Sequence, residues 1–296
     1  MANDVYQIVT DRIVSQLEQG VIPWRMPWSG AWSGGFNGAV SYTTGRPYSF
    51  LNQMLLGESG EYLTFNQVKT LGGNVKKGAK SRLVVFYKPL VLKSKDTDAS
   101  QDGKTDEHQR IIPMLRYYHV FHIKDTEGIE SKLKQQDERH HDPIAEADSA
   151  ADEYVSRNAP LRLIITSSNK AFYSPSDDSV TVPELDQYDV KEEFYSTLFH
   201  ELTHSTMTKE RCDRKQPEGF SFFGSHEYSK EELVAEMGAA MSLKRLGIDC
   251  DKAFTNSVGY IQSWLKKLRD DKKFVVWAAG KAEQAVKYMF NDKEKE

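Results

Sequence analysis

Residues 194–204 of this chain read Phe194-Tyr195-Ser196-Thr197-Leu198-Phe199-His200-Glu201-Leu202-Thr203-His204. The apolar spacing predicts a buried helix, on which His200 and His204 lie one turn apart and can share a metal ion. Glu201 is placed to deprotonate a water molecule at the metal and to pass the proton to a leaving amine. The H-E-x-x-H pattern therefore predicts the active site of a zinc-dependent hydrolase. The alternative is a helix that carries a surface histidine pair.

A third protein ligand must come from elsewhere in the chain, because such a site uses three and leaves a fourth position open. Residues 231–236, Glu231-Glu232-Leu233-Val234-Ala235-Glu236, begin a second predicted helix. We expect Glu232 to bind the metal and Glu236, on the same face, to accept the free ring N–H of a ligand histidine. Glu231 stays open as a competitor, and acids that merely solvate the helix are the simpler alternative. Two histidines and one glutamate suit Zn²⁺, and Mn²⁺ as well.

The composition indicates a soluble protein. The chain has 296 residues, of which 39% are hydrophobic and 28% charged, enough to bury the cores of two domains. No apolar run approaches the length of a membrane span, so no membrane association is expected, and the first twenty residues read as a helix rather than a signal peptide. Cys212 and Cys250 are not spaced as a metal-binding pair. We therefore expect a cytoplasmic protein.

Charge is divided unevenly along the chain. Lys plus Arg against Asp plus Glu gives 15 − 11 = +4 for residues 1–125 and 24 − 32 = −8 for residues 126–296. Within residues 60–95 there are eight basic residues and one acid, Glu61, and aromatic residues lie between them. The N-terminal half is thus the candidate for binding a polyanion.

Single-stranded DNA is a ligand that suits this pattern, because Lys and Arg neutralise phosphates and aromatic rings stack on unpaired bases. The predicted DNA contacts are Arg46, Tyr48, Phe65, Lys69, Lys76, Lys77, Lys80 and Arg82. The alternative is a solvated lysine-rich loop beside a buried strand, with Phe86 in the core.

The predicted fold class is α+β in two domains. Residues 1–125 form an α+β domain with a polar loop at 93–110, residues 126–143 a linker, and residues 144–296 a mainly helical domain with a small sheet. In the second domain, a strand is predicted at 161–166 and a hairpin at 171–174 and 179–182.

Two sets of motifs resemble the ArdC family of antirestriction proteins, and the resemblance covers nearly the whole chain. The N-terminal set is Val9-Thr10-Asp11-Arg12-Ile13, Leu17-Glu18-Gln19-Gly20, Pro23-Trp24, Pro27-Trp28, Thr44-Gly45-Arg46-Pro47-Tyr48, Asn52, Leu63-Thr64-Phe65-Asn66-Gln67, Gly72-Gly73 and Lys77-Gly78. The C-terminal set is Phe199-His200-Glu201-Leu202-Thr203-His204 and Tyr228-Ser229-Lys230-Glu231-Glu232-Leu233-Val234-Ala235-Glu236.

The resemblance implies a single-stranded-DNA-binding N-terminal domain and a zincin-like metallopeptidase C-terminal domain. It also implies carriage on conjugative plasmids, protection of incoming plasmid DNA from host restriction, and a host restriction-system protein as a further partner. Two other interpretations remain: an intracellular zinc metallopeptidase without a DNA role, and a binding protein whose metal is structural.

Overall fold

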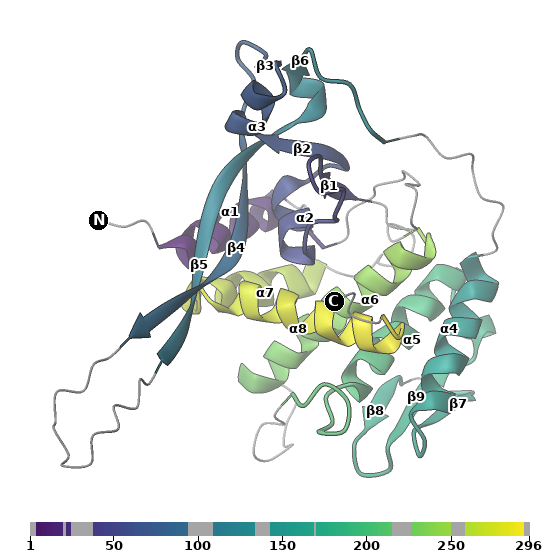
Figure 1. Cartoon of the computed structure of the whole chain (residues 1–296). Helices are drawn as coiled ribbons and strands as arrows, with labels where there is room; N and C mark the ends of the chain where they lie inside the picture. The colour runs from purple at the N-terminus through teal and green to yellow at the C-terminus, as the bar shows by residue number, and fades with distance from the viewer. Residues whose placement is uncertain are drawn as a thin grey trace, which may run out of the picture.

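The N-terminal half is built on a sheet that extends into a long two-stranded ribbon, and the C-terminal half is a group of helices with a small sheet (Figure 1). This computed structural model describes residues 4–19, 22–24, 38–93, 109–133, 143–168, 170–214, 226–249 and 258–292. The α+β class predicted from the sequence is confirmed. Within those ranges, no helix is both long enough and apolar enough to cross a membrane.

The N-terminal sheet has the strand order β1-β2-β5-β4, with β1 parallel to β2 and the other pairs antiparallel. A separate antiparallel pair joins β3 to β6. The described elements are α1 (Val5–Glu18), β1 (Ala39–Ser41), α2 (Phe50–Leu56), β2 (Gly60–Thr64), α3 (Phe65–Thr70), β3 (Asn74–Val75), β4 (Arg82–Lys93), β5 (Gln109–His122), η1 (Ile123–Asp125) and β6 (Thr126–Glu127).

Strands β4 and β5 form the ribbon, in a register that runs from Arg82 opposite Val120 to Lys93 opposite Gln109. The predicted loop at 93–110 lies between these two strands, and its residues 94–108 fall outside the described ranges. On the outer side of β4, Asn52 of α2 donates to the Val85 carbonyl and accepts from the Val85 N–H, both at 2.7 Å. This side chain satisfies backbone groups that an open sheet edge leaves unpaired.

The C-terminal half contains the predicted strand and hairpin, which form a sheet in the order β7-β9-β8. Strand β7 runs parallel to β9, and β8 runs antiparallel to it. The described elements are α4 (Pro143–Arg157), β7 (Arg162–Thr166), β8 (Phe172–Ser174), β9 (Ser179–Pro183), η2 (Leu185–Gln187), α5 (Lys191–Ser205), α6 (His226–Leu246), α7 (Val258–Asp270) and α8 (Phe274–Met289).

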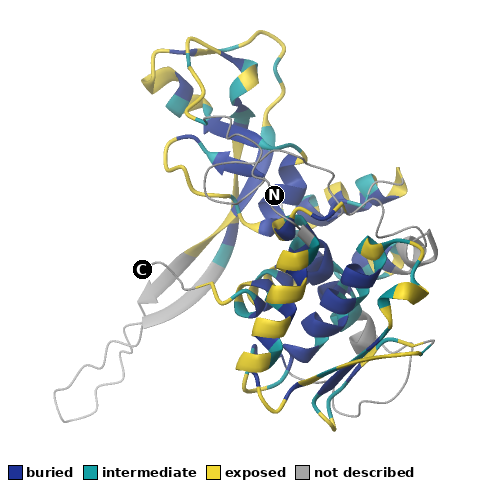
Figure 2. Cartoon of the chain, turned by 90° about the vertical axis from the view of Figure 1, so that its right-hand side faces the viewer, coloured by how far each residue is buried: buried dark blue, intermediate teal, exposed yellow. Residues whose placement is uncertain are grey.

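One hydrophobic cluster joins the two halves of the chain. It contains Ile13 of α1, Met54 of α2 and Met237 of α6, all fully buried. In the same cluster, Trp24 packs edge-on against Trp264 of α7, with ring centroids 5.2 Å apart. The buried residues of the helices that meet there are dark blue in Figure 2. The α6 helix is therefore held by the N-terminal elements as well as by its own half.

The predicted linker differs from the structure in its first part. Strand β6 pairs with β3, and the Tyr42 hydroxyl donates to the Glu130 carbonyl at 3.1 Å. Glu61, which is only 2% exposed, accepts hydrogen bonds from the Ser131 hydroxyl at 2.6 Å and the Lys132 N–H at 3.0 Å. A buried carboxylate requires such partners, so residues 126–133 are packed on the N-terminal sheet. Residues 134–142 fall outside the described ranges, and α4 begins at Pro143.

Candidate functional site

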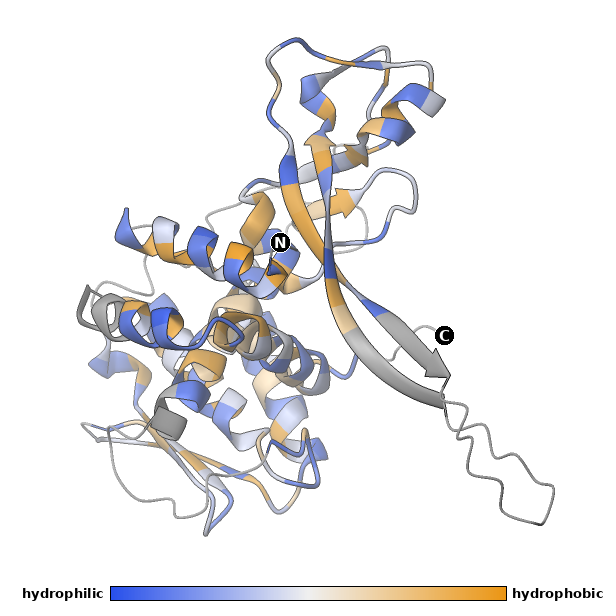
Figure 3. Ribbon diagram, turned by 90° about the vertical axis from the view of Figure 1, so that its left-hand side faces the viewer, coloured by the Kyte–Doolittle hydropathy of each residue, from blue (hydrophilic) through white to orange (hydrophobic). Residues whose placement is uncertain are grey.

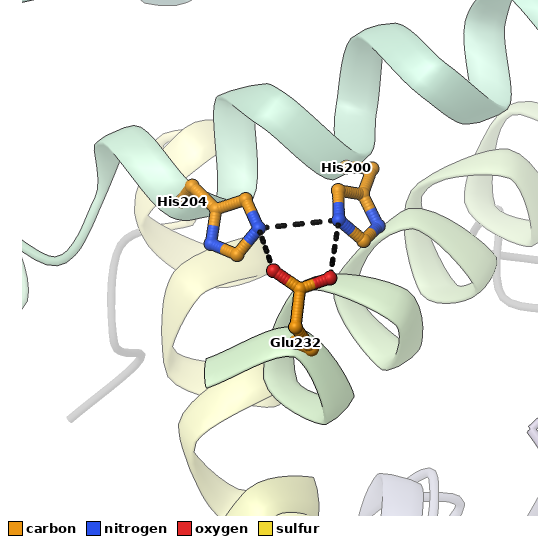
Figure 4. A group of neighbouring side chains, drawn as sticks. All are labelled: His200, His204 and Glu232. Atoms are coloured by element: carbon orange, nitrogen blue, oxygen red, sulfur yellow. Dashed lines mark hydrogen bonds and ion pairs between the residues drawn. The ribbon is translucent and has the colours of Figure 1, made fainter. Parts of the chain in front are cut away.

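The two predicted histidines lie on α5, and the third predicted ligand lies on α6. Helix α5 buries Leu198, Phe199 and Leu202 in a second hydrophobic cluster, against the sheet and α6. His200 and His204 occupy another face of α5, one turn apart, and Glu232 reaches them from the N-terminal part of α6 (Figure 4). The sequence pattern and the helix packing thus bring these three side chains together.

The spacing of the three side chains fits a metal ion. His200 Nε2 lies 3.1 Å from His204 Nε2, and the two nitrogens lie 3.5 and 3.3 Å from the carboxylate oxygens of Glu232. A tetrahedral centre with bonds of about 2.0–2.1 Å separates its ligand atoms by about 3.3–3.4 Å. One possible ligand atom from each of the three residues therefore lies within 4.8 Å of the other two. The donor set of two imidazoles and one carboxylate suits a divalent cation, with room in the tetrahedron for a fourth ligand.

Two further carboxylates face the outer nitrogens of the histidines. Glu236, the predicted support, lies 3.9 Å from His200 Nδ1. Glu231 lies 3.6 Å from His204 Nδ1, on the far side of the ring from Glu232. Glu231 therefore lies behind the His204 ring, outside the space between the two rings that Glu232 occupies.

Sequence reasoning missed Arg214, which holds Glu231 in place. Its guanidinium donates to the two oxygens of Glu231 at 2.6 and 3.1 Å, to Thr206 Oγ1 at 2.6 Å and to the Thr203 carbonyl at 2.8 Å. Arg214 is 4% exposed. A lone arginine ten residues after His204 carries no motif, so only the folded chain reveals this contact.

The carboxylates make the site attractive to positive charge. Burial by itself lowers the pKa of His204, but its hydrogen bonds to Glu231 and Glu232 raise that pKa to about 10. Burial and the neighbouring His204 lower the pKa of His200, but the hydrogen bond to Glu232 and the charges of Glu201 and Glu232 raise it overall. Burial would raise the pKa of Glu232, yet the two histidines hold it below its usual range. The trio therefore favours a positive charge, and a metal ion at this place would compete with protons for the same nitrogen and oxygen atoms.

Glu201, the predicted base, is buried next to the trio. Its charge is among those that raise the pKa of both histidines, which indicates its proximity to their rings. The close approach of α5 to α6 depends on Gly238, where an added Cβ would lie 2.5 Å from Thr203 Oγ1. This contact lets Glu232 reach the histidines.

The predicted DNA contacts lie in several environments in the N-terminal half. Arg46, Lys77 and Lys80 are exposed. Phe65 is exposed at the start of α3, with Lys69 Nζ 5.8 Å from its ring centroid, and Lys76 Nζ donates to the Lys124 carbonyl at 2.7 Å. Hydrophilic residues predominate on the loops around α3 and β3 (Figure 3).

Tyr48 and Arg82 are less accessible. Tyr48 is half-buried, edge-on to Tyr62 at 6.3 Å. The Arg82 guanidinium donates to Glu58 at 2.6 Å, to the Leu56 carbonyl at 2.9 Å and to the Tyr62 hydroxyl at 2.7 Å. Arg82 thus binds partners within its own domain.

Comparison with known proteins places the chain in a family. Residues 3–121 match the family model of the N-terminal domain of anti-restriction factor ArdC, and residues 150–281 match a zincin-like metallopeptidase family model. The crystal structure of antirestriction protein ArdC from plasmid R388, with Mn(II) bound, superimposes with a TM-score of 0.72 at 30% identity over 99% of both chains. The chain belongs to the ArdC family. The metal-free structure of the same ArdC gives a TM-score of 0.72 at 31% identity, over 97% of this chain and 96% of that one.

Other relatives of this ArdC-family chain extend the comparison. An uncharacterized protein of Sinorhizobium fredii, y4eC, is 30% identical over 97% of this chain and 91% of its own length. DNA primase TraC of Escherichia coli is 28% identical over 98% of this chain, which spans 20% of TraC. The antirestriction family and the zincin-like domain predicted from the sequence are confirmed, and the Mn(II) in the ArdC crystal structure agrees with a divalent metal.

Proposed function

We propose that the chain binds single-stranded DNA without sequence preference and protects incoming conjugative plasmid DNA from host restriction. The observation that carries the proposal is an exposed basic and aromatic region in a domain of the ArdC type. Glu61, the only acid among residues 60–95, is buried and accepts hydrogen bonds from the Ser131 hydroxyl and the Lys132 N–H, so no carboxylate of this stretch is exposed beside the lysines. We assign residues 1–133 to the DNA-binding unit and residues 143–296 to the zincin-like unit.

The exposed lysines Lys76, Lys77 and Lys80 are the charges that we expect to contact phosphates, with Phe65 as a ring that stacks on a base. Lys69 and Arg46 lie on the same domain and add to the positive potential. We assign Arg82 a supporting role, because its guanidinium already donates to Glu58, to the Leu56 carbonyl and to the Tyr62 hydroxyl.

In the zincin-like unit we propose that His200, His204 and Glu232 hold Zn²⁺ or Mn²⁺. A divalent cation there supplies Lewis acidity to a peptide carbonyl and acidifies water. Glu201 takes the proton from the attacking water and delivers it to the leaving amine. Glu236 and Glu231 orient the two imidazoles through their Nδ1 atoms. A host restriction-system protein is the proposed substrate or docking partner.

Fluorescence anisotropy of a labelled single-stranded oligonucleotide, with its duplex for comparison, tests the DNA role at several salt concentrations. We expect tight binding that prefers the single strand and weakens with salt. Replacement of Lys76, Lys77 and Lys80 by Ala should reduce the slope of log affinity against log salt by about 2, at about 0.7 per lost phosphate contact. Binding without salt dependence, or none at all, contradicts the proposal.

A matched control removes the same charge from the other half of the chain. Lys170, Lys191 and Lys209 are exposed on the zincin-like unit, and their replacement by Ala should leave the salt slope unchanged. An equal loss of affinity in both triple variants means that only net charge matters, which contradicts a DNA site on the N-terminal domain.

The metal-binding geometry also favours peptidase activity, independent of DNA. Glu201→Gln removes the base and leaves His200, His204 and Glu232 intact. Cleavage of a casein digest by the metal-loaded protein should disappear, while metal affinity and thermal stability stay close to those of the unchanged protein. Cleavage that persists in the Glu201→Gln protein contradicts the role of Glu201 as the base.

A further inference from the structure

The β4–β5 ribbon carries exposed aromatic rings that the predicted DNA contacts do not include. Val84 pairs with Tyr118 and Phe86 with Arg116, so Phe86, Arg116 and Tyr118 project from one face of the ribbon. Phe86 is 39% and Tyr118 37% exposed. Their rings meet edge to face, with centroids 5.4 Å apart. The alternative that Phe86 belongs to the core is wrong, because the ribbon extends beyond the elements that cover Val84.

The ribbon is positively charged and contains no acid. Residues 82–93 and 109–122 include five basic residues and no Asp or Glu. On the face of Phe86 and Tyr118, Arg116 and Lys88 are exposed, and Lys88 pairs with Met114 in the next step of the register. Tyr48 lies at the inner end of this face, where an interaction with Tyr118 adds to burial in raising its pKa.

We propose that this face of the ribbon, formed by Phe86, Tyr118, Arg116 and Lys88, is a stacking platform for the bases of single-stranded DNA. Large exposed rings next to cations, on strands whose own sequence contains no acid, match a ligand that offers both flat apolar surfaces and negative charge. A single strand offers both, whereas a duplex conceals the faces of its bases. The platform rests on the proposed DNA-binding function and gives it a location: rings on the ribbon stack with bases, and Arg116 and Lys88 contact the adjoining phosphates.

The opposite face of the ribbon provides a matched control. Tyr87, 56% exposed, and Tyr117 project from that face, in register with Leu115 and Val85. Tyr87 interacts there with Tyr6 of α1. Replacement of Tyr87 and Tyr117 by Ala removes two exposed rings from the same two strands, but none from the platform.

The test compares three full-length proteins: the unchanged chain, the platform double variant and the control double variant. Each is titrated into a labelled oligothymidine and, separately, into a strand of equal length that has abasic sites in place of bases. Phe86→Ala with Tyr118→Ala should lower affinity for oligothymidine by about 10-fold per ring or more, with an unchanged salt slope. In the same double variant the preference for oligothymidine over the abasic strand should shrink to the part that Phe65 contributes. The Tyr87→Ala, Tyr117→Ala protein should bind like the unchanged chain.

A further variant, Arg116→Gln, should reduce the salt slope by about 0.7 and leave the preference for oligothymidine over the abasic strand intact. Thermal melting of each variant verifies that these exposed substitutions leave the fold intact. If the unchanged chain binds single strands and both double variants bind equally well, the platform is wrong and the DNA site lies elsewhere on the N-terminal domain. If the unchanged chain does not bind at all, the proposed function itself fails.

Discussion

Substitution of Gly238 by Ala should separate the two helices that carry the candidate metal ligands. A Cβ at Gly238 would lie 2.5 Å from Thr203 Oγ1 and 2.6 Å from Thr203 Cγ2. Thr203 is fully buried, and its hydroxyl donates to the Phe199 carbonyl at 2.7 Å. The side chain therefore cannot rotate away from the added Cβ without losing this hydrogen bond. Because ordinary contacts are about 3.5–4.0 Å, α5 and α6 must separate there by about 1 Å.

The magnitude follows from two opposing terms. Overpacking of this kind costs about 1–3 kcal/mol, and the upper value applies because two atoms clash and neither can move. Alanine in place of a helical glycine recovers about 1 kcal/mol. The free energy of unfolding should therefore fall by about 2 kcal/mol. Glu232 lies six residues before Gly238 on α6, about 9 Å along the helix, so its carboxylate also shifts relative to the two histidines.

Urea unfolding and competition with a chromophoric chelator measure the two effects. Metal affinity should fall by about 10-fold or more, since ligand distances in such sites tolerate only about 0.2 Å. Gly280→Ala in α8 is the control: no atom lies within 4 Å of its added Cβ, and the variant should be more stable by about 0.5–1 kcal/mol. Adding Thr203→Ala to Gly238→Ala should restore most of both losses. Unchanged stability and metal affinity in the Gly238→Ala protein would refute the helix-contact argument.

Three further outcomes are expected. Arg214→Met removes the two-pronged partner of the buried Glu231 and leaves it only His204, so the free energy of unfolding in urea should fall by about 3 kcal/mol, and an unchanged value would contradict the role of this pair. Burial raises the pKa of Glu58, but hydrogen bonds from Lys124 and Arg82 lower it to about 2 from 4.5. The resulting stability is present above pH 4.5 and is lost as pH falls toward 2, so Glu58→Gln should flatten the acid-unfolding curve in that window. Adding Mn²⁺ or Zn²⁺ at 100 times its Kd to chelator-treated protein should stabilise it by about 2.7 kcal/mol, seen as a higher melting temperature that is absent in His204→Ala.

Much of the fold was predictable because it depends on local periodicity. The strand at 161–166 and the hairpin at 171–174 and 179–182 are β7, β8 and β9, within a residue or two at each end. The linker was less predictable: residues 126–133 are polar and lack periodicity, and they are ordered by partners such as Glu61 that lie more than sixty residues away in sequence.

The sequence by itself determined the pairing of His200 with His204, because a spacing of four residues in a helix places both rings on one face. It also determined Glu232 as a candidate ligand on a second helix, but not its rank above Glu231. Only the tertiary structure gives their positions, since the distance between α5 and α6 places Glu232 between the two rings, whereas Glu231 is bound by Arg214. In the same way, only the tertiary structure shows that Phe86 is exposed. The strand register places it on the face of Val84, and the ribbon extends there beyond the elements that cover Val84. Spacing along one element is encoded locally, whereas the approach of two elements depends on packing contacts throughout the core.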